Sequence, residues 1–288
     1  MGYLYLVLAV IGLASSSISG SFFNRKNENR NGATPLYSLI SGISVFVLWG
    51  VLFLFDGTVE TGVILYSLLF ACGFACSMIS LVYALKTGPI VLTSLIMQLS
   101  LIITTVWGFF FWGTQFTWLI LVGLILIVIS LWLCLYTKKK EENKINLRWI
   151  IWTLLAFIGN ATCTIVQRTQ QMNFDGKYGN FMMMVATFIS MLFCLVMYLL
   201  SDKSHSKIII KTSWYYPVAT GTLNVLLNFC MIMLATTSLS PSLIYPVIAI
   251  ASLALTTVFS AFVFKEKMRP WQWVGVFIGA IAVAILSI

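Results

Sequence analysis

The chain has 288 residues, of which 60% are hydrophobic and only 9% are charged, and its formal net charge is +9. A soluble domain carries about 25% charged residues, so this composition excludes an ordinary soluble protein and places most of the chain in lipid. The positive charge does not indicate a nucleic-acid partner, because the basic residues fall in short segments between apolar runs, as in membrane proteins.

Ten apolar runs follow one another, each near the ~20 residues that a helix needs to cross the hydrocarbon layer. None alternates as a strand does, and helices satisfy their own backbone hydrogen bonds in lipid. We therefore predict an all-α membrane protein with ten transmembrane helices. The runs cover residues 2–21, 35–55, 61–85, 89–112, 117–136, 149–171, 179–200, 213–236, 241–263 and 270–288. Arg25 and Lys26 follow the first run, the reverse of a signal peptide, so we expect this helix to be retained.

The positions of lysine and arginine predict the orientation. All but two of the 17 Lys and Arg residues lie in the segments after the first, third, fifth, seventh and ninth runs, and the exceptions are Arg168 and Lys177. Segments rich in these residues face the cytoplasm. We therefore predict a multi-pass protein of the cytoplasmic membrane with both termini outside.

Two parts of the chain recur at a nearly constant offset. The matched pairs are Pro89 with Pro241, Thr104-Thr105-Val106 with Thr256-Thr257-Val258, Val122-Gly123 with Val274-Gly275, and AVIGLASSSISGSFF (9–23) with AFIGNATCTIVQRTQ (156–170). Five helices per copy is an odd number, so the second copy must insert upside down. We predict two inverted five-helix repeats, residues 1–140 and 141–288.

Two stretches resemble a known family. YALKTGPIVLTSLIMQLSLIITTVWGFFFWG (83–113) and LATTSLSPSLIYPVIAIASLALTTVFSAFVFKEKMRPWQWVGVFIGAIAVAIL (234–286) are similar to matching stretches in the two halves of EamA-type proteins, which belong to the drug/metabolite transporter superfamily. Glu266 falls at the family's acidic corner, whereas FWGTQFTW (111–118) has no acid. The resemblance covers essentially the whole chain and implies ten helices, inverted repeats and alternating access. It implies a substrate among metabolites, amino acids, sugars or drugs.

All eight Asp and Glu residues lie in loops or at the ends of the apolar runs. A carboxylate at mid-membrane is costly and usually functional. Its absence argues against the exchange of protons for cationic drugs that small multidrug members of this superfamily perform. A membrane-embedded enzyme would need an acid, histidine or nucleophile cluster within the runs, and none is visible. We therefore expect neither enzymatic activity nor a cofactor or metal site.

Neutral polar side chains instead recur at helical spacing within the runs. They include Asn160, Thr164 and Gln167 on 149–171, Asn224 and Asn228 on 213–236, Gln98 on 89–112, and Ser17 on 2–21. Such residues can simply hydrogen-bond neighbouring helices. Stripes on matched faces of both halves favour a shared wet cavity, and we predict that Asn160, Asn224, Asn228 and Gln98 line it.

Four further residues are candidates for substrate contact. Arg168, near the outer end of 149–171, can extend to the lipid headgroups or hold a carboxylate or phosphate of the substrate. Tyr83 continues the polar face of the third run, and Trp107, well inside the fourth, is expected to face the cavity. Tyr245 precedes Pro246, where a lost backbone hydrogen bond makes a bending point.

These features predict a secondary transporter that moves a small polar or amphipathic metabolite across the bilayer by alternating access, as a monomer or a homodimer. On grounds of the resemblance, an amino acid or a similar zwitterion, exported from the cell, is the first substrate class. A sugar or nucleoside carrier fits the same neutral site, and a multidrug exporter would hold cationic compounds on aromatic rings. A channel is disfavoured, because no charged or carbonyl-rich filter motif is visible.

Overall fold

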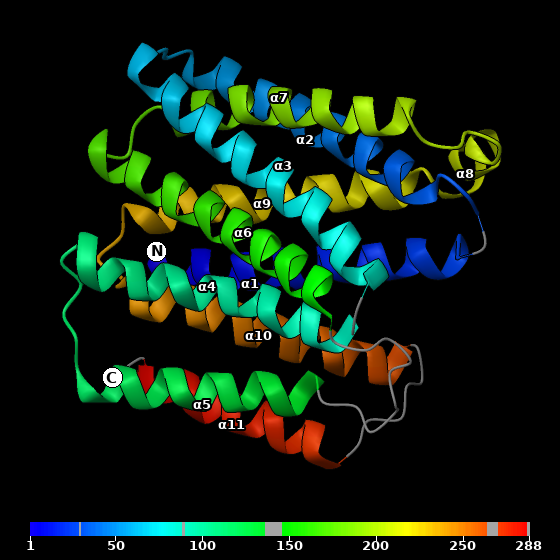
Figure 1. The fold of residues 1–288 in the computed structure, drawn as a ribbon. Helices are drawn as coiled ribbons and strands as arrows, with labels where there is room; N and C mark the ends of the chain where they lie inside the picture. Colours follow the sequence, from blue (N-terminus) through cyan, green and yellow to red (C-terminus); the bar gives the residue numbers. More distant parts are fainter. Residues whose placement is uncertain (29, 88–89, 136–145, 264–269, 287–288) are drawn as a thin grey trace. The chain divides into compact units, whose positions relative to one another are not determined.

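The computed structural model describes residues 1–288 except 29, 88–89, 136–145, 264–269 and 287–288, and it leaves out the side chains of some helical residues, including Gln98. The described part of the chain forms eleven α-helices and one 3-10 helix and contains no strand (Figure 1). The α-helices are α1 (Gly2–Lys26), α2 (Ala33–Asp56), α3 (Ile64–Thr87), α4 (Ile90–Phe111), α5 (Trp118–Leu135), α6 (Leu147–Asn173), α7 (Gly179–Leu199), α8 (Ser206–Ser213), α9 (Tyr215–Ala235), α10 (Pro241–Val263) and α11 (Pro270–Leu286). The 3-10 turn Thr61–Val63 leads into α3.

The all-helical fold expected from the sequence is confirmed. Each of the ten apolar runs contains one long helix. Seven of the described helices, α1, α2, α3, α6, α7, α9 and α10, are long and apolar enough to cross a membrane, and the described parts of α4, α5 and α11 form shorter apolar helices. The number of crossings and their inverted arrangement stay predictions.

Helix α8 is the element that the sequence analysis missed, so the described chain has eleven α-helices where ten were expected. It lies in the stretch between the seventh and eighth runs. Eight residues rise only about 12 Å, far less than the hydrocarbon thickness. Its three isoleucines have lysines on both sides, and only Ile209 is buried. A pattern this short carries too little apolar periodicity to be read as a helix.

Local chemistry fixes several helix ends. Gly32 and Gly57, with φ of 73° and 62°, flank α2 in the left-handed conformation that glycine adopts without steric cost. The amide of Gly57 donates to the carbonyl of Phe53 and so satisfies one terminal carbonyl. Helices α10 and α11 both begin at a proline, whose fixed φ suits the first helical position.

The chain divides into two compact units. Unit one comprises Met1–Ala71 and Gln167–Thr236, and unit two comprises Cys72–Val166 and Thr237–Ile288. Each unit therefore draws on both halves of the sequence, and α3 and α6 contribute a part to each. The predicted repeat boundary at residue 140 lies outside the described residues, as does Glu266, so the division into sequence repeats stays a prediction.

Unit one is built from antiparallel helix pairs. In the pair α2–α7, the rings of Phe46 and Phe188 lie 5.4 Å apart, and those of Phe53 and Phe181 lie 5.7 Å apart. Rising residue numbers on α2 thus meet falling numbers on α7. Helix α1 packs against α9, where the hydroxyl of Ser19 donates to the carbonyl of Tyr216 over 2.9 Å.

Unit two repeats the antiparallel arrangement in α5 and α11. Ser130, late in α5, donates to the carbonyl of Gly275, early in α11, and Gly123, early in α5, faces Leu286 at the end of α11. Helix α4 packs against α10, where the hydroxyl of Thr105 donates to the carbonyl of Pro241 over 3.4 Å.

One close helix crossing occurs in the same form inside each unit. In unit one, a Cβ added to Gly12 would lie 3.1 Å from the carbonyl oxygen of Leu223 and 3.2 Å from the amide nitrogen of Leu227. In unit two, a Cβ added to Gly159 would lie 2.6 Å from the carbonyl oxygen of Gly73 and 2.7 Å from the amide nitrogen of Ser77. Both glycines therefore face the same two backbone groups, four residues apart, on a partner helix. Gly12 and Gly159 are also the aligned glycines of AVIG and AFIG.

Candidate functional site

Three of the predicted site residues form one hydrogen-bonded chain in unit one. The Nε2 atom of Gln167 on α6 donates to Oδ1 and to the backbone carbonyl of Asn228 on α9, over 3.3 and 3.4 Å. The Nδ2 atom of Asn228 in turn donates to the carbonyl and to Oδ1 of Asn224, both over 2.9 Å. Gln167 is buried and the two asparagines are partly buried. Amides four residues apart on α9 thus present a linked set of donors and acceptors to α6.

Two more predicted residues pair with α4 in unit two. The Nδ2 atom of Asn160 donates to Oγ of Ser100 over 2.6 Å, and the hydroxyls of Thr164 and Thr104 lie 2.6 Å apart. Ser100 and Thr104 are fully buried. This ladder joins two pairs of residues, each spaced four apart on its own helix, so it follows one face of each helix.

The sequence analysis did not single out Ser100 and Thr104. It assigned the polar face of the fourth run to Gln98, whereas the structure turns Ser100 and Thr104 toward α6. The side chain of Gln98 lies outside the described residues, so its predicted role in the cavity stays a prediction. The spacing of Ser100 and Thr104 equals that of Asn160 and Thr164, which is the signal that could have found them.

The spacing argument placed Asn160, Thr164 and Gln167 on one face of helix α6, and the contacts of this helix agree with that assignment. Residues up to Val166 belong to unit two and residues from Gln167 belong to unit one, so the polar face contributes to both units. The same face ends at Gln171, whose amide nitrogen donates to Gln170. The Oε1 atom of Gln171 is buried and has no hydrogen-bond partner among the described residues.

Arg168 is buried, with 8% of its surface exposed. A side chain that reaches the headgroups along the lipid-facing surface would be exposed, so this burial argues against the snorkelling interpretation. Gln170 and Gln171, also buried, follow it on the last turn of α6. Arg168 is therefore a buried cation within the polar segment 167–171, whose other residues are three glutamines and Thr169.

The three aromatic candidates belong to unit two, where each makes a ring contact. The ring of Tyr83 on α3 stacks on Trp152 of α6, with centroids 4.8 Å apart, and Tyr83 is 45% exposed. Trp107 stacks on Phe111 within α4 and is 38% exposed. Tyr245 is buried on α10, just before Pro246, and its ring lies 6.4 Å from that of Trp112.

Ser17 is not brought into the amide chain. Its side chain is exposed on α1, and its hydroxyl donates to the carbonyl of Leu13 in its own helix. The neighbouring Ser19 makes the contact with α9 instead. The predicted role of Ser17 in substrate binding therefore stays a prediction, and no described contact in unit one supports it.

The described residues contain no group of three or more His, Cys, Asp or Glu side chains placed to hold a metal ion. The polar side chains described above are amides, hydroxyls and one guanidinium. Such groups can bind a ligand by hydrogen bonds and, at Arg168, by charge.

The described part of the chain is all helical, and seven of its helices are long and apolar enough to cross a membrane. Residues 147–288 match the EamA-like transporter family. On this match, carried by its second half, the chain belongs to the EamA-like transporter family, which is part of the drug/metabolite transporter superfamily. Membership implies a small-molecule substrate and a lipid environment.

A solved structure titled "Crystal structure of protein" has the same fold. It is 10% identical in sequence, with a TM-score of 0.77, and the match covers 99% of this chain and 95% of that one. At this identity the likeness concerns the fold alone. No curated protein sequence matches the chain closely enough to count as a relative.

Proposed function

We propose that this protein is a secondary transporter of the cytoplasmic membrane that exports an amino acid or a similar small zwitterion by alternating access. The observation that carries the proposal is the amide chain of Gln167, Asn228 and Asn224 in unit one. Amides are both donors and acceptors, so they can bind a polar solute without a net charge of their own. Arg168 supplies the single charge suited to a carboxylate.

The polar face of α6 supports a binding role beyond helix packing. Hydrogen bonds between membrane helices contribute only about 0.6 kcal/mol each on average, so helix packing alone gives little reason for a long polar face. Helix α6 instead carries Asn160, Thr164, Gln167 and Gln171 along one face, and the buried Oε1 of Gln171 lacks a partner in the described part of the chain. An unsatisfied buried acceptor is costly, and a substrate N–H group would satisfy it.

Alternating access by inverted repeats is part of the proposal. The matched crossings at Gly12 and Gly159 and the antiparallel pairs α2–α7 and α5–α11 support it. In inverted-repeat transporters one part of the fold rocks against another around a central site.

A sugar or nucleoside carrier is the second candidate. The Asn160–Ser100 and Thr164–Thr104 contacts offer hydroxyls and amides without charge, which suit a polyhydroxylated ligand. A substrate without a carboxylate would leave Arg168 without a role in binding, so the two candidates differ in what they require of this residue.

The test is flux in liposomes that contain the purified full chain. A thermal-shift screen against amino acids, sugars, nucleosides and quaternary amines first identifies a ligand, because a compound that binds the native state raises the melting temperature. We expect saturable uptake of that ligand, accelerated by unlabelled ligand on the opposite side. Flux without saturation or trans-stimulation would contradict a carrier.

Asn228→Ala tests the site itself, because it removes the side-chain acceptor of Gln167 and the side-chain donor to Asn224. We expect flux to fall about fivefold to a hundredfold, as for the loss of a buried amide worth roughly 1–3 kcal/mol. Thr222→Ala is the matched control, since this exposed α9 hydroxyl bonds only to Val218 of its own helix. Equal flux in both variants at equal abundance would show that the amide chain only packs helices.

A further inference from the structure

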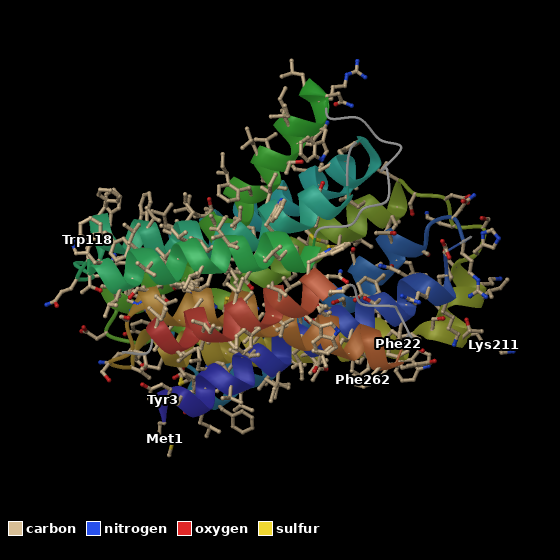
Figure 2. The ribbon with its side chains drawn as sticks, turned by 90° about the horizontal axis from the view of Figure 1, so that it is seen from below. Met1, Tyr3, Phe22, Trp118, Lys211 and Phe262 are labelled. Atoms are coloured by element: carbon tan, nitrogen blue, oxygen red, sulfur yellow. The ribbon has the colours of Figure 1, made fainter. Side chains whose placement is uncertain are left out.

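Basic side chains from two distant segments gather around α8 in unit one. They are Arg25, Lys26 and Arg30 from the end of α1 and the turn after it, and Lys203, Lys207 and Lys211 from the approach to α8 and α8 itself. The Nζ atom of Lys26 donates to the carbonyl of Thr212 over 2.7 Å, and Arg30 donates to the Thr212 hydroxyl over 3.2 Å. Figure 2 shows Lys211 at the Phe22 end of unit one, away from Met1 and Tyr3.

The two segments are held together by a close backbone approach as well as by the hydrogen bonds to Thr212. Asn27 is buried, donates to the carbonyl of Phe23 over 2.8 Å, and accepts from Arg30 over 2.8 Å. Gly32 has a φ of 73°, and a Cβ there would overlap the carbonyl oxygen of Asp202. The cations are thus held on one folded surface.

Few acids offset these charges. The described residues of the two segments contain only Glu28 and Asp202 as acids against six Lys and Arg residues. Hydrogen bonds from the backbone and side chain of Ser204 hold the pKa of Asp202 below its usual value, so Asp202 is ionised at neutral pH. The surface keeps a net positive charge with both acids ionised.

Helix α8 presents apolar as well as basic groups on this surface. Ile209 is buried against Phe23 and Leu36 and fixes the helix to unit one. Lys207 and Lys211 lie one turn apart on an exposed face, and Ile208 and Ile210 are 50% and 46% exposed. Trp214 and Tyr215, both exposed, follow directly and are typical of the membrane–water boundary.

We propose that this α8 surface binds the headgroups of anionic phospholipids. A short helix with lysines and exposed isoleucines suits a position in the plane of the interface, where lysine meets phosphate and isoleucine meets the acyl boundary. The neighbouring aromatic residues place α8 at that depth. The binding involves none of the residues of the amide chain, so it does not depend on the proposed function.

The test uses the full chain in detergent, with dioctanoyl phosphatidylglycerol and dioctanoyl phosphatidylcholine as probes. The melting temperature is followed as each lipid is titrated. For the unmodified protein we expect a saturable rise with phosphatidylglycerol that phosphatidylcholine does not reproduce. In the variant Lys207→Gln/Lys211→Gln, the midpoint of this rise should move to at least about tenfold higher lipid, because each basic residue near an anionic surface contributes about fivefold.

Two control variants test whether the lipid response depends on the positive charges of α8. Lys177→Gln removes a charge at the opposite end of α7 and should leave the phosphatidylglycerol response unchanged, and Lys207→Arg/Lys211→Arg should retain it. Equal responses to the two lipids, or a double glutamine variant that responds like the unmodified protein, would overturn the proposal. Inorganic phosphate that reproduced the rise would also overturn it, because the ligand would then be a free anion.

Discussion

At the scale of single residues, three glutamine side chains are buried near the end of α6. Gln167, Gln170 and Gln171 are all buried, and each makes at least one hydrogen bond. A buried amide that lost its hydrogen-bond partner would cost roughly 1–3 kcal/mol. Several buried amides at one helix end therefore need polar partners around them. Arg168 within this segment raises the cost further, because a buried cation needs hydrogen-bond or charge partners.

Arg168→Gln tests whether the guanidinium recognises a carboxylate. A hydrogen bond to a charged group contributes about 1.5–3 kcal/mol, so we expect the apparent affinity for a carboxylate ligand to fall about tenfold to a hundredfold. Affinity for the same compound as its amide or ester should change much less. Isothermal titration with both compounds measures this difference.

Lys177→Gln is the control for Arg168, since it removes one positive charge from an exposed position in the turn between α6 and α7. Its affinity for the carboxylate ligand should match that of the unmodified protein. An Arg168→Gln variant that binds the acid as tightly as the unmodified protein would assign Arg168 a purely structural role.

Helical spacing was enough to group Asn160, Thr164 and Gln167, because residues three and four apart must share a face. It could not choose among the faces of α4, since both the Gln98 face and the Ser100–Thr104 face repeat polar residues. Which face meets α6 depends on how the two helices are rotated in the packed fold. The same reason explains why Ser17 was chosen on α1 and Ser19 makes the contact.

At the scale of elements, close crossings decide how the helices pair. Membrane helices gain no hydrophobic free energy from association within lipid, so small residues that allow backbone approach determine the interface. Gly12 against α9 and Gly159 against α3 serve this purpose in unit one and unit two, respectively. Gly12 and Gly159 align in the two copies of the sequence repeat, and the structure shows that both lie at close helix crossings.

Alanine substitutions at the two glycines test how closely the helices approach at each crossing. We expect Gly159→Ala to lower stability by about 1–3 kcal/mol, because its added methyl meets backbone atoms that cannot rotate away. Gly12→Ala has 3.1 Å to its nearest atom and should cost less. The melting temperatures of the two purified variants measure which substitution destabilises the protein more.

Gly50→Ala in α2 is the matched control, because nothing lies within 4 Å of the added methyl. Alanine favours the helix over glycine by up to about 1 kcal/mol, so this variant should be as stable as the unmodified protein or more stable. A Gly159→Ala protein no less stable than Gly50→Ala would contradict the close crossing.

At the scale of the whole molecule, the distribution of charge predicts how the chain lies in the membrane. Lys203, Lys207 and Lys211 around α8 are among the residues from which a cytoplasmic position is predicted for the segment between the seventh and eighth runs. The ten predicted crossings are an even number, so the prediction puts both termini on the same side.

A reporter fused after Ile288 tests this orientation. We expect an enzyme that works only outside the cytoplasm to be active there, and one that works only in the cytoplasm to be inactive. The same pair of reporters fused after Lys211, beside α8, should give the opposite result. Activity of the cytoplasmic reporter at Ile288 would reverse the predicted topology.

The sequence by itself determined the all-helical class, the approximate places of the long apolar helices and the family resemblance, because apolar runs of crossing length admit few folds in lipid. Only the tertiary structure decided that α8 is a helix, that Ser100 and Thr104 meet α6, and that each compact unit mixes both sequence halves. These outcomes depend on contacts between residues far apart in the chain, and no local pattern of hydrophobicity encodes the rotation of one helix against another.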